Sequence, residues 1–161
     1  DLRLLELSLW QPAARMGARN SVFFPAETIL TDTGNTHLRT DTFWAGGECL
    51  FWTPDSTGEQ KAFLFTVPEA GKKRIYLTLA LTPLSGIIKV VLDGKEVQFT
   101  EAKTEIDLHR PHRILLRNFA LPETELSAGE HYLTLIYSGA EPEIESPEIG
   151  IDFIWVQSIN E

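Results

Sequence analysis

The sequence is poor in the residues that mark disulfide-linked, zinc-bound and membrane-spanning chains. It has one cysteine in 161 residues, Cys49, which excludes an intrachain disulfide and a four-cysteine zinc site. No run approaches the roughly 20 consecutive apolar residues of a membrane-spanning helix. The Gly-x-Ser-x-Gly elbow, the His-Glu-x-x-His pair and the glycine-rich phosphate and dinucleotide loops are also absent. The enzyme classes that depend on those motifs are therefore excluded.

Positive charge is scarce as well. The chain has 14 Lys and Arg against 23 Asp and Glu, so its formal net charge is −9. A chain of this charge repels phosphate backbones and anionic lipids, and we expect neither a nucleic-acid partner nor membrane insertion. Neutral ligands, cations and basic partners remain open. The length is that of one domain of ordinary size, with enough residues to bury its own core.

Apolar and polar residues alternate in several stretches from about Ser21 onward, which is the pattern of strands with one face in the core. Asp93-Gly94 stands between two stretches and favours a type I′ hairpin turn, because both central residues of that turn need φ > 0. With turn residues between the stretches and no long amphipathic helix, the sequence predicts an all-β fold, an antiparallel jelly-roll β-sandwich. The apolar members of the main stretches are Phe63, Phe65 and Val67; Ile75, Leu77, Leu79 and Leu81; Ile88, Val90 and Leu92; and Leu133, Leu135 and Tyr137.

The first twenty residues differ from the rest of the chain. They are leucine-rich up to Trp10 and are interrupted at Pro12, and both a short helix and a strand fit such a run. We expect residues 1–20 to form an N-terminal extension and residues 21–161 to form the β-sandwich module. The chain begins at Asp1, a start that removal of a signal peptide and excision of a domain would both produce.

Six segments of the chain follow one another in the order of a known family. They are Ala26-Glu27, the stretch from Trp44 to Trp52, the Val67–Gly71 turn, the Leu92–Lys95 hairpin, the Leu126–His131 turn and the closing Gly150–Ile154 strand. Together they resemble the galactose-binding-domain-like β-sandwich, of the carbohydrate-binding-module type found on bacterial glycoside-hydrolase-like and other secreted proteins. The resemblance implies a non-catalytic carbohydrate-binding or accessory module of a secreted or periplasmic, cell-envelope bacterial protein.

The aromatic stretch before Cys49 offers a candidate sugar site. Sugars stack their apolar C–H faces on aromatic rings while polar neighbours bind the hydroxyl groups. Phe43 and Trp44 supply such rings, and His37, Arg39 and Asp41 precede them with hydrogen-bonding groups. We expect these five residues to bind the ligand. The alternative is that Trp44 closes the end of the sandwich.

A second candidate site follows from the resemblance. In calcium-binding relatives, the glutamate of an early Ala-Glu pair and an acid of the last strand help to hold a structural calcium ion, which implies such a role for Glu27 and Asp152. Calcium prefers oxygen ligands, including carboxylates. The alternative is that Glu27 faces solvent and Asp152 forms hydrogen bonds with neighbouring backbone.

Two further functions remain open from the sequence. The chain fits a module that docks a neighbouring domain of a larger protein and binds no sugar, for which the apolar N-terminal segment is suited. A glycoside-processing enzyme is the third possibility, since such enzymes need two carboxylates about 5–9.5 Å apart. The nearest acids to such a cluster are Glu27, Asp41, Glu48 and Asp152.

Overall fold

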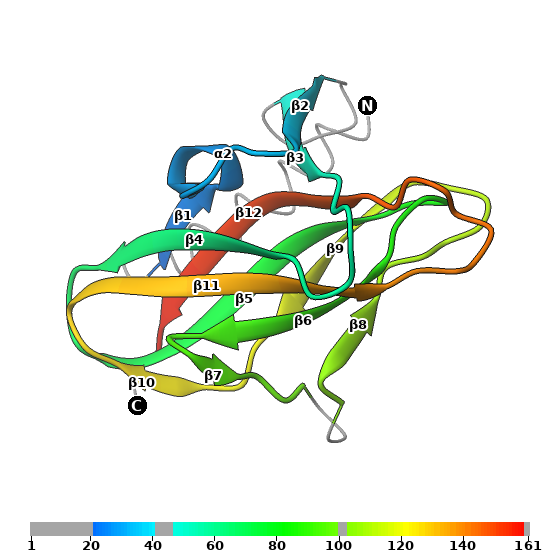
Figure 1. Ribbon diagram of the computed structural model, residues 1–161. Coiled ribbons are helices and arrows are strands. Elements are labelled where there is room, and N and C mark those ends of the chain that lie inside the picture. Colours follow the sequence, from blue (N-terminus) through cyan, green and yellow to red (C-terminus); the bar gives the residue numbers. More distant parts are fainter. Residues whose placement is uncertain (1–20, 41–46, 100–102, 160–161) are drawn as a thin grey trace.

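Two antiparallel sheets packed face to face make up the computed structural model, which describes residues 21–40, 47–99 and 103–159 (Figure 1). The first sheet has seven strands: β1 (Ser21–Pro25), β2 (Thr36–Thr40), β3 (Glu48–Trp52), β5 (Gly71–Leu81), β9 (Leu115–Ala120), β10 (Thr124–Leu126) and β12 (Ile149–Ser158). The second sheet has five: β4 (Gln60–Val67), β6 (Ile87–Leu92), β7 (Lys95–Glu96), β8 (Glu105–Asp107) and β11 (Gly129–Gly139).

The strand order follows from long-range antiparallel pairing. The seven-stranded sheet runs β10-β5-β12-β3-β2, with β1 on β12 and β9 on β5. The other sheet runs β4-β11-β6-β7, with β8 on β6. Figure 1 shows β4, β11 and β6 in one layer and β12, β5 and β9 in the other. The predicted antiparallel β-sandwich is confirmed.

The core lies between the two layers and uses the alternating residues that the sequence singled out. On β5 the inward side chains Ile75, Leu77 and Leu79 are fully buried, and on β4 Phe63 faces the same core. Burying one such side chain contributes roughly 1.5–3 kcal/mol. Cys49 belongs to a smaller cluster with Phe51 and Ala80, separate from the main core.

The predicted Asp93-Gly94 hairpin is present. Leu92 pairs with Lys95, so the turn has two central residues. Their φ angles are 49° at Asp93 and 83° at Gly94, both in the left-handed region that a type I′ turn requires. Glycine takes this conformation without steric cost, and Asp is among the few other residues that tolerate it.

The last strand contains a β-bulge at Asp152. Ile151 pairs with Leu79 on β5, whereas Phe153 pairs with the adjacent Thr78, which leaves Asp152 as the extra residue. The bulge changes which positions face the core, from Ile149 and Ile151 before it to Ile154 and Val156 after it. This shift explains why the strand is apolar on both faces in sequence and yet carries a buried acid.

A short helix, α2 (Ala26–Ile29), follows β1 directly and packs on β3, β4 and β12. Pro25 precedes it with a fixed φ, and the Thr28 hydroxyl donates to the Pro25 carbonyl at 2.6 Å. Ala26 is buried and Glu27 is exposed. Within the described residues, no helix has the length and apolar character needed to cross a membrane.

Candidate ligand-binding site

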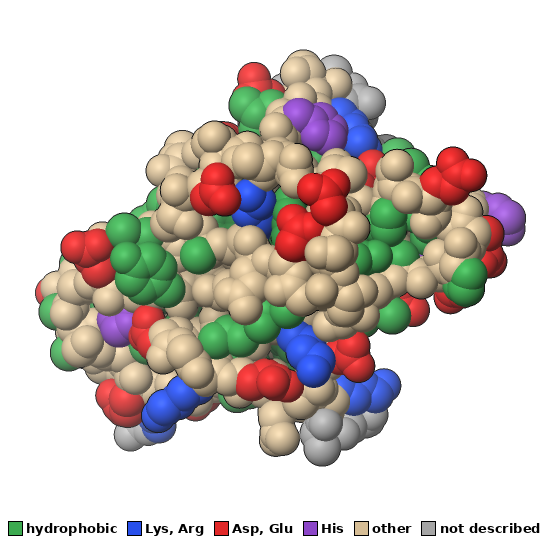
Figure 2. All heavy atoms as spheres, viewed as in Figure 1, with side chains coloured by type: hydrophobic (Ala, Val, Ile, Leu, Met, Phe, Trp, Pro, Cys, Tyr) green, Lys and Arg blue, Asp and Glu red, His purple; other side chains and the backbone are tan. Residues whose placement is uncertain are grey.

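Two of the five predicted sugar-binding residues lie together on β2. His37 and Arg39 are two positions apart on one face of the strand, over the Phe51 ring of β3. The Arg39 guanidinium carbon is 3.7 Å from the centroid of that ring, and the His37 ring stacks on it at 6.0 Å with an interplanar angle of 24°. In Figure 2, a histidine and a basic side chain lie side by side over β2, at the top of the view.

Glu148 fixes the orientation of Arg39. The guanidinium donates two hydrogen bonds to the carboxylate, at 2.9 and 3.3 Å. Glu148 also accepts the Thr82 hydroxyl at 3.0 Å, and that hydroxyl lies 2.9 Å from Ser85 Oγ. A bidentate arginine–carboxylate pair of this kind is strong and directional. Sequence reasoning missed Glu148, because it is 109 residues from Arg39 and no local pattern marks it.

Asp41, Phe43 and Trp44 lie outside the residues that the structure describes. Their segment, residues 41–46, connects Thr40 at the end of β2 with Gly47 just before β3. It therefore continues directly from the strand that carries His37 and Arg39. The stacking role of Trp44 and Phe43 stays a prediction, as does the hydrogen-bonding role of Asp41.

The charges of the two acids predicted to bind calcium both act on Cys49. Asp152, at the bulge of β12, is 2% exposed, while Glu27 on α2 is exposed. Burial raises the pKa of the Cys49 thiol well above its usual value, and the negative charges of Asp152, Glu27 and Glu148 raise it further. Arg39 opposes that rise. Carboxylates from two distant parts of the sequence, Glu27 on α2 and Glu148 with Asp152 at and just before β12, thus act on one buried position.

The donor set fits calcium only in part. Calcium takes six to eight oxygen ligands, and Glu27 and Asp152 offer carboxylates from two elements that pack together. Among residues 21–40, 47–99 and 103–159, however, no three His, Cys, Asp or Glu side chains converge as metal ligands. Backbone carbonyls would therefore have to supply the rest of the coordination.

A buried histidine connects two of the turns that carry the family resemblance. His131 Nδ1 is 2.5 Å from the Asp93 carboxylate, and Nε2 is 2.7 Å from the Ser127 carbonyl. Burial opposes the charged ring, but the Ser127 carbonyl and the Asp93 carboxylate together raise the pKa of His131. Asp93 also accepts the Tyr132 backbone N–H at 2.8 Å. These contacts hold the hairpin against β11 and give this part of the motif a structural role.

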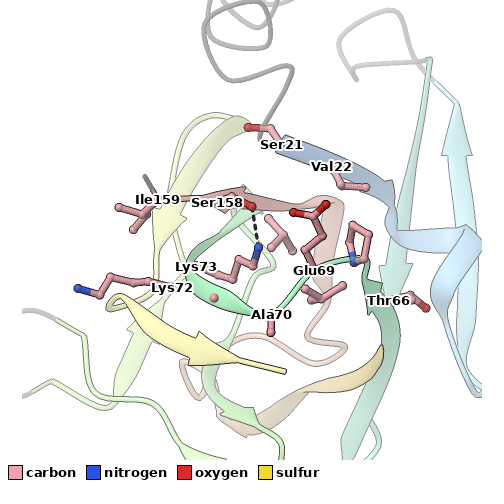
Figure 3. Close-up of a pocket in the computed structure, with 13 residues that line it drawn as sticks. Ser21, Val22, Thr66, Glu69, Ala70, Lys72, Lys73, Ser158 and Ile159 are labelled. Carbon is pink, nitrogen blue, oxygen red and sulfur yellow. Dashed lines mark hydrogen bonds between the residues drawn. The ribbon is translucent and has the colours of Figure 1, made fainter. Parts of the chain in front are cut away.

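A cavity of about 240 Å³ opens at the end of the sandwich where β4 turns into β5 (Figure 3). Val67, Pro68 and Val156 form part of its wall. Lys73 enters it from β5, and its ammonium group donates to Ser158 Oγ at 2.7 Å. No feature of the sequence indicated this cavity, since its residues come from β1, the β4–β5 turn, β5 and the end of β12.

The chain matches no family model and no curated protein. Solved structures do match it. A xanthan lyase from Paenibacillus superimposes with a TM-score of 0.71 at 18% identity, over 85% of this chain and 13% of that one. A family 35 carbohydrate-binding module from Clostridium thermocellum gives 0.60 at 15% identity, over 86% of this chain and 98% of that module. The Podospora anserina GH26-CBM35 β-(1,4)-mannanase gives 0.59 at 17% identity, over 88% and 28%.

These likenesses establish the fold. The chain is a β-sandwich of the type found in carbohydrate-binding modules of families 35, 36 and 6, which are all among its structural neighbours. The prediction of a carbohydrate-binding-module type sandwich is thereby confirmed. The chain spans only 13% of the xanthan lyase and 28% of the mannanase, but nearly the whole of the isolated family 35 module. Its neighbours thus include modules whose structures were solved alone and modules within longer chains of carbohydrate-active enzymes.

Proposed function

We propose that this chain is a non-catalytic carbohydrate-binding or accessory module. The observation that carries the proposal is the polar surface on β2, where Arg39 lies over Phe51 in a fixed orientation and His37 stacks beside it. An arginine has five N–H donors. Glu148 accepts two of those of Arg39, and the other three have no acceptor among the described residues, which leaves them for ligand hydroxyls.

The mechanism combines stacking with directed hydrogen bonds. Trp44, with Phe43, would supply the ring face for the sugar, and His37, Arg39 and Asp41 would bind its hydroxyl groups. Glu148 already holds the Arg39 side chain in one orientation. Ligand binding therefore costs less side-chain conformational entropy than it would with a mobile arginine.

A glycan array followed by an affinity gel tests the proposal. We expect wild type to bind at least one glycan, and Trp44→Ala to weaken binding by about tenfold or more through loss of the stacked ring. Tyr132→Ala is the matched control, because Tyr132 is an aromatic residue 49% exposed on β11 of the other sheet. It should bind as wild type does.

Two results would contradict the proposal. Equal losses of binding in Trp44→Ala and Tyr132→Ala would show that the aromatic segment has no specific role. A folded wild-type chain that binds no glycan would favour the alternative, a module that docks a neighbouring domain of a larger protein.

We also propose that Glu27 and Asp152 help to hold a structural calcium ion, whose positive charge would offset the carboxylates around Cys49. A ligand that binds only the folded state raises stability by about 2.7 kcal/mol at a hundredfold excess over its Kd. Calcium should therefore raise Tm, a chelator should lower it, and Glu27→Gln should reduce both responses. A Tm that is indifferent to calcium and chelator contradicts this role.

We further infer a secreted or periplasmic, cell-envelope location in a bacterial protein. The support is that the structural neighbours include enzymes named for the polysaccharides on which they act. Fractionation of the source cells tests the location, and recovery of the chain in the cytosolic fraction contradicts it.

A further inference from the structure

The cavity at the β4–β5 end contains a buried cation, Lys73, that has no acidic partner among the residues the structure describes. Lys73 is 4% exposed, and within the described ranges its ammonium group forms one hydrogen bond, to the Ser158 hydroxyl. Buried lysines are rare unless they are paired, because removing an ammonium group from water is costly. An ammonium group has three N–H donors, so two of those of Lys73 are left over.

A carboxylate approaches the same space from the turn between β4 and β5. Figure 3 shows Glu69 extending toward the part of the cavity where Lys73 meets Ser158. Glu69 is exposed to solvent, and within the described part of the chain it forms no hydrogen bond or ion pair with Lys73 or any other residue. The cavity therefore presents a donor group and an acceptor group that do not satisfy each other.

A third polar group in the lining is buried and without a partner among the described residues. The Oγ atom of Ser21, at the start of β1, is buried and has no hydrogen-bond partner within the described residues. Buried polar atoms are usually bonded to protein or to ordered water, and each one left alone costs about 1–3 kcal/mol. Val22, Val67 and Val156 supply apolar wall between these polar groups.

The combination of charges selects the kind of ligand. A simple anion would meet Glu69, and a simple cation would meet Lys73. A hydroxyl group both donates and accepts, so one hydroxyl of an uncharged sugar can accept from Lys73 while its neighbour donates to Glu69. The apolar wall suits the C–H groups of the same ring.

We propose that this cavity is a second binding site for an uncharged sugar, separate from the β2 surface. The proposal rests on the carbohydrate-binding function proposed above. It assigns Lys73 and Glu69 as the residues that determine specificity, with Ser158 holding Lys73 in place.

Chemical-shift mapping of the ¹⁵N-labelled chain tests the site. The probes are glucose, galactose, mannose and xylose, each at millimolar concentration, with glycine and sodium acetate in parallel titrations. We expect at least one sugar to shift the backbone amides of Ala70, Gly71, Lys73 and Ser158. Trp44→Ala should leave these shifts intact, because the proposed sites are separate.

Two substitutions identify the groups responsible. Glu69→Ala should raise the Kd measured at these amides by about tenfold, the loss expected for one hydrogen bond to a charged group. Glu105→Ala, which removes an exposed carboxylate on β8, should leave that Kd unchanged. Lys73→Met should abolish the shifts, provided that the spectrum keeps the dispersion of a folded chain.

Several outcomes would overturn the second site. If sugars shift only amides near β2, this site is wrong and the proposed function stands. If glycine or acetate shifts the cavity amides and the sugars do not, the cavity binds a zwitterion or an anion instead. If no sugar shifts any amide of the folded chain, both proposals are wrong. Equal effects of Glu69→Ala and Glu105→Ala would show that only net charge matters.

Discussion

Replacing Arg39 by methionine should destabilise the fold as well as weaken ligand binding. The change removes two hydrogen bonds to the Glu148 carboxylate and the contact of the guanidinium with Phe51. Glu148, whose side chain is 9% exposed, then keeps its charge with the Thr82 hydroxyl as its one remaining side-chain partner among the described residues. Leaving a buried charge unpaired is among the most costly changes that a single substitution makes.

The size of the effect follows from these contacts. Hydrogen bonds to charged groups contribute about 1.5–3 kcal/mol each, and an exposed cation–ring contact adds about 0.5–1 kcal/mol. The Arg39 side chain is 35% exposed, so solvent screens part of the interaction. We therefore expect a loss of about 2–4 kcal/mol, which for a chain of this length is a fall in Tm of roughly 5–15 °C.

A double-mutant cycle measured by urea denaturation provides the assay. Arg39→Met, Glu148→Gln and the double variant should give a coupling energy of about 1.5–3 kcal/mol. The same cycle on Lys61 and Asp32 is the control and should give a smaller coupling, because the Asp32 side chain is 74% exposed. A coupling between Arg39 and Glu148 below about 0.5 kcal/mol would refute the reasoning.

Three further predictions concern the scaffold. The pKa of His131 is raised in the folded chain, so its contact with Asp93 stabilises the fold fully below pH about 6.5. This stabilisation is lost as the pH rises through the folded-state pKa. His131→Gln should therefore remove this part of the pH dependence of the free energy of unfolding. Gly150→Ala should cost at least about 1–3 kcal/mol in urea denaturation, because the added methyl group would lie 2.7 Å from the Phe51 ring. Cys49 should resist iodoacetamide at pH 8 until the chain is unfolded, and rapid labelling of the native protein would contradict its burial.

The fold could be predicted from the sequence because its strands and turns are encoded locally. The alternation along β5 identified the core positions Ile75, Leu77 and Leu79, and the Asp93-Gly94 pair identified a hairpin. Both signals depend on residues close together in the chain, whose side-chain direction or φ angle follows from local geometry.

The bulge on β12 shows where local patterns fail. An apolar run on both faces does not reveal that the inward positions change from Ile151 to Ile154, because that change depends on the pairing of β12 with β5. The burial of Asp152 follows from the same pairing. The family resemblance singled out Asp152 as a calcium ligand. Its burial is explained only by the pairing register of β12 with β5.

The candidate site was predictable only in part, for a related reason. His37 and Arg39 were identified as polar neighbours of an aromatic segment, but the carboxylate that orients Arg39 comes from the other end of the chain. Local sequence similarly predicted the turn at Asp93 but not its contact with His131. Side chains that come together only through the pairing of distant strands form no local sequence motif, so the sequence alone does not reveal their contact.

The partners of the cations in the two candidate sites indicate how each site would use its charge. Arg39 is neutralised by a buried carboxylate, so its remaining N–H groups can bind a ligand without exposing an unpaired charge when the ligand leaves. Lys61, which belongs to neither site, donates hydrogen bonds to the carboxylate and the backbone carbonyl of Asp32. Its ammonium group therefore has acceptors without any ligand. In the part of the chain that the structure describes, the ammonium group of Lys73 is bonded to the Ser158 hydroxyl alone. Of these three cations, Lys73 therefore gains most from an additional acceptor, and this makes the β4–β5 cavity a binding site that the family resemblance did not suggest.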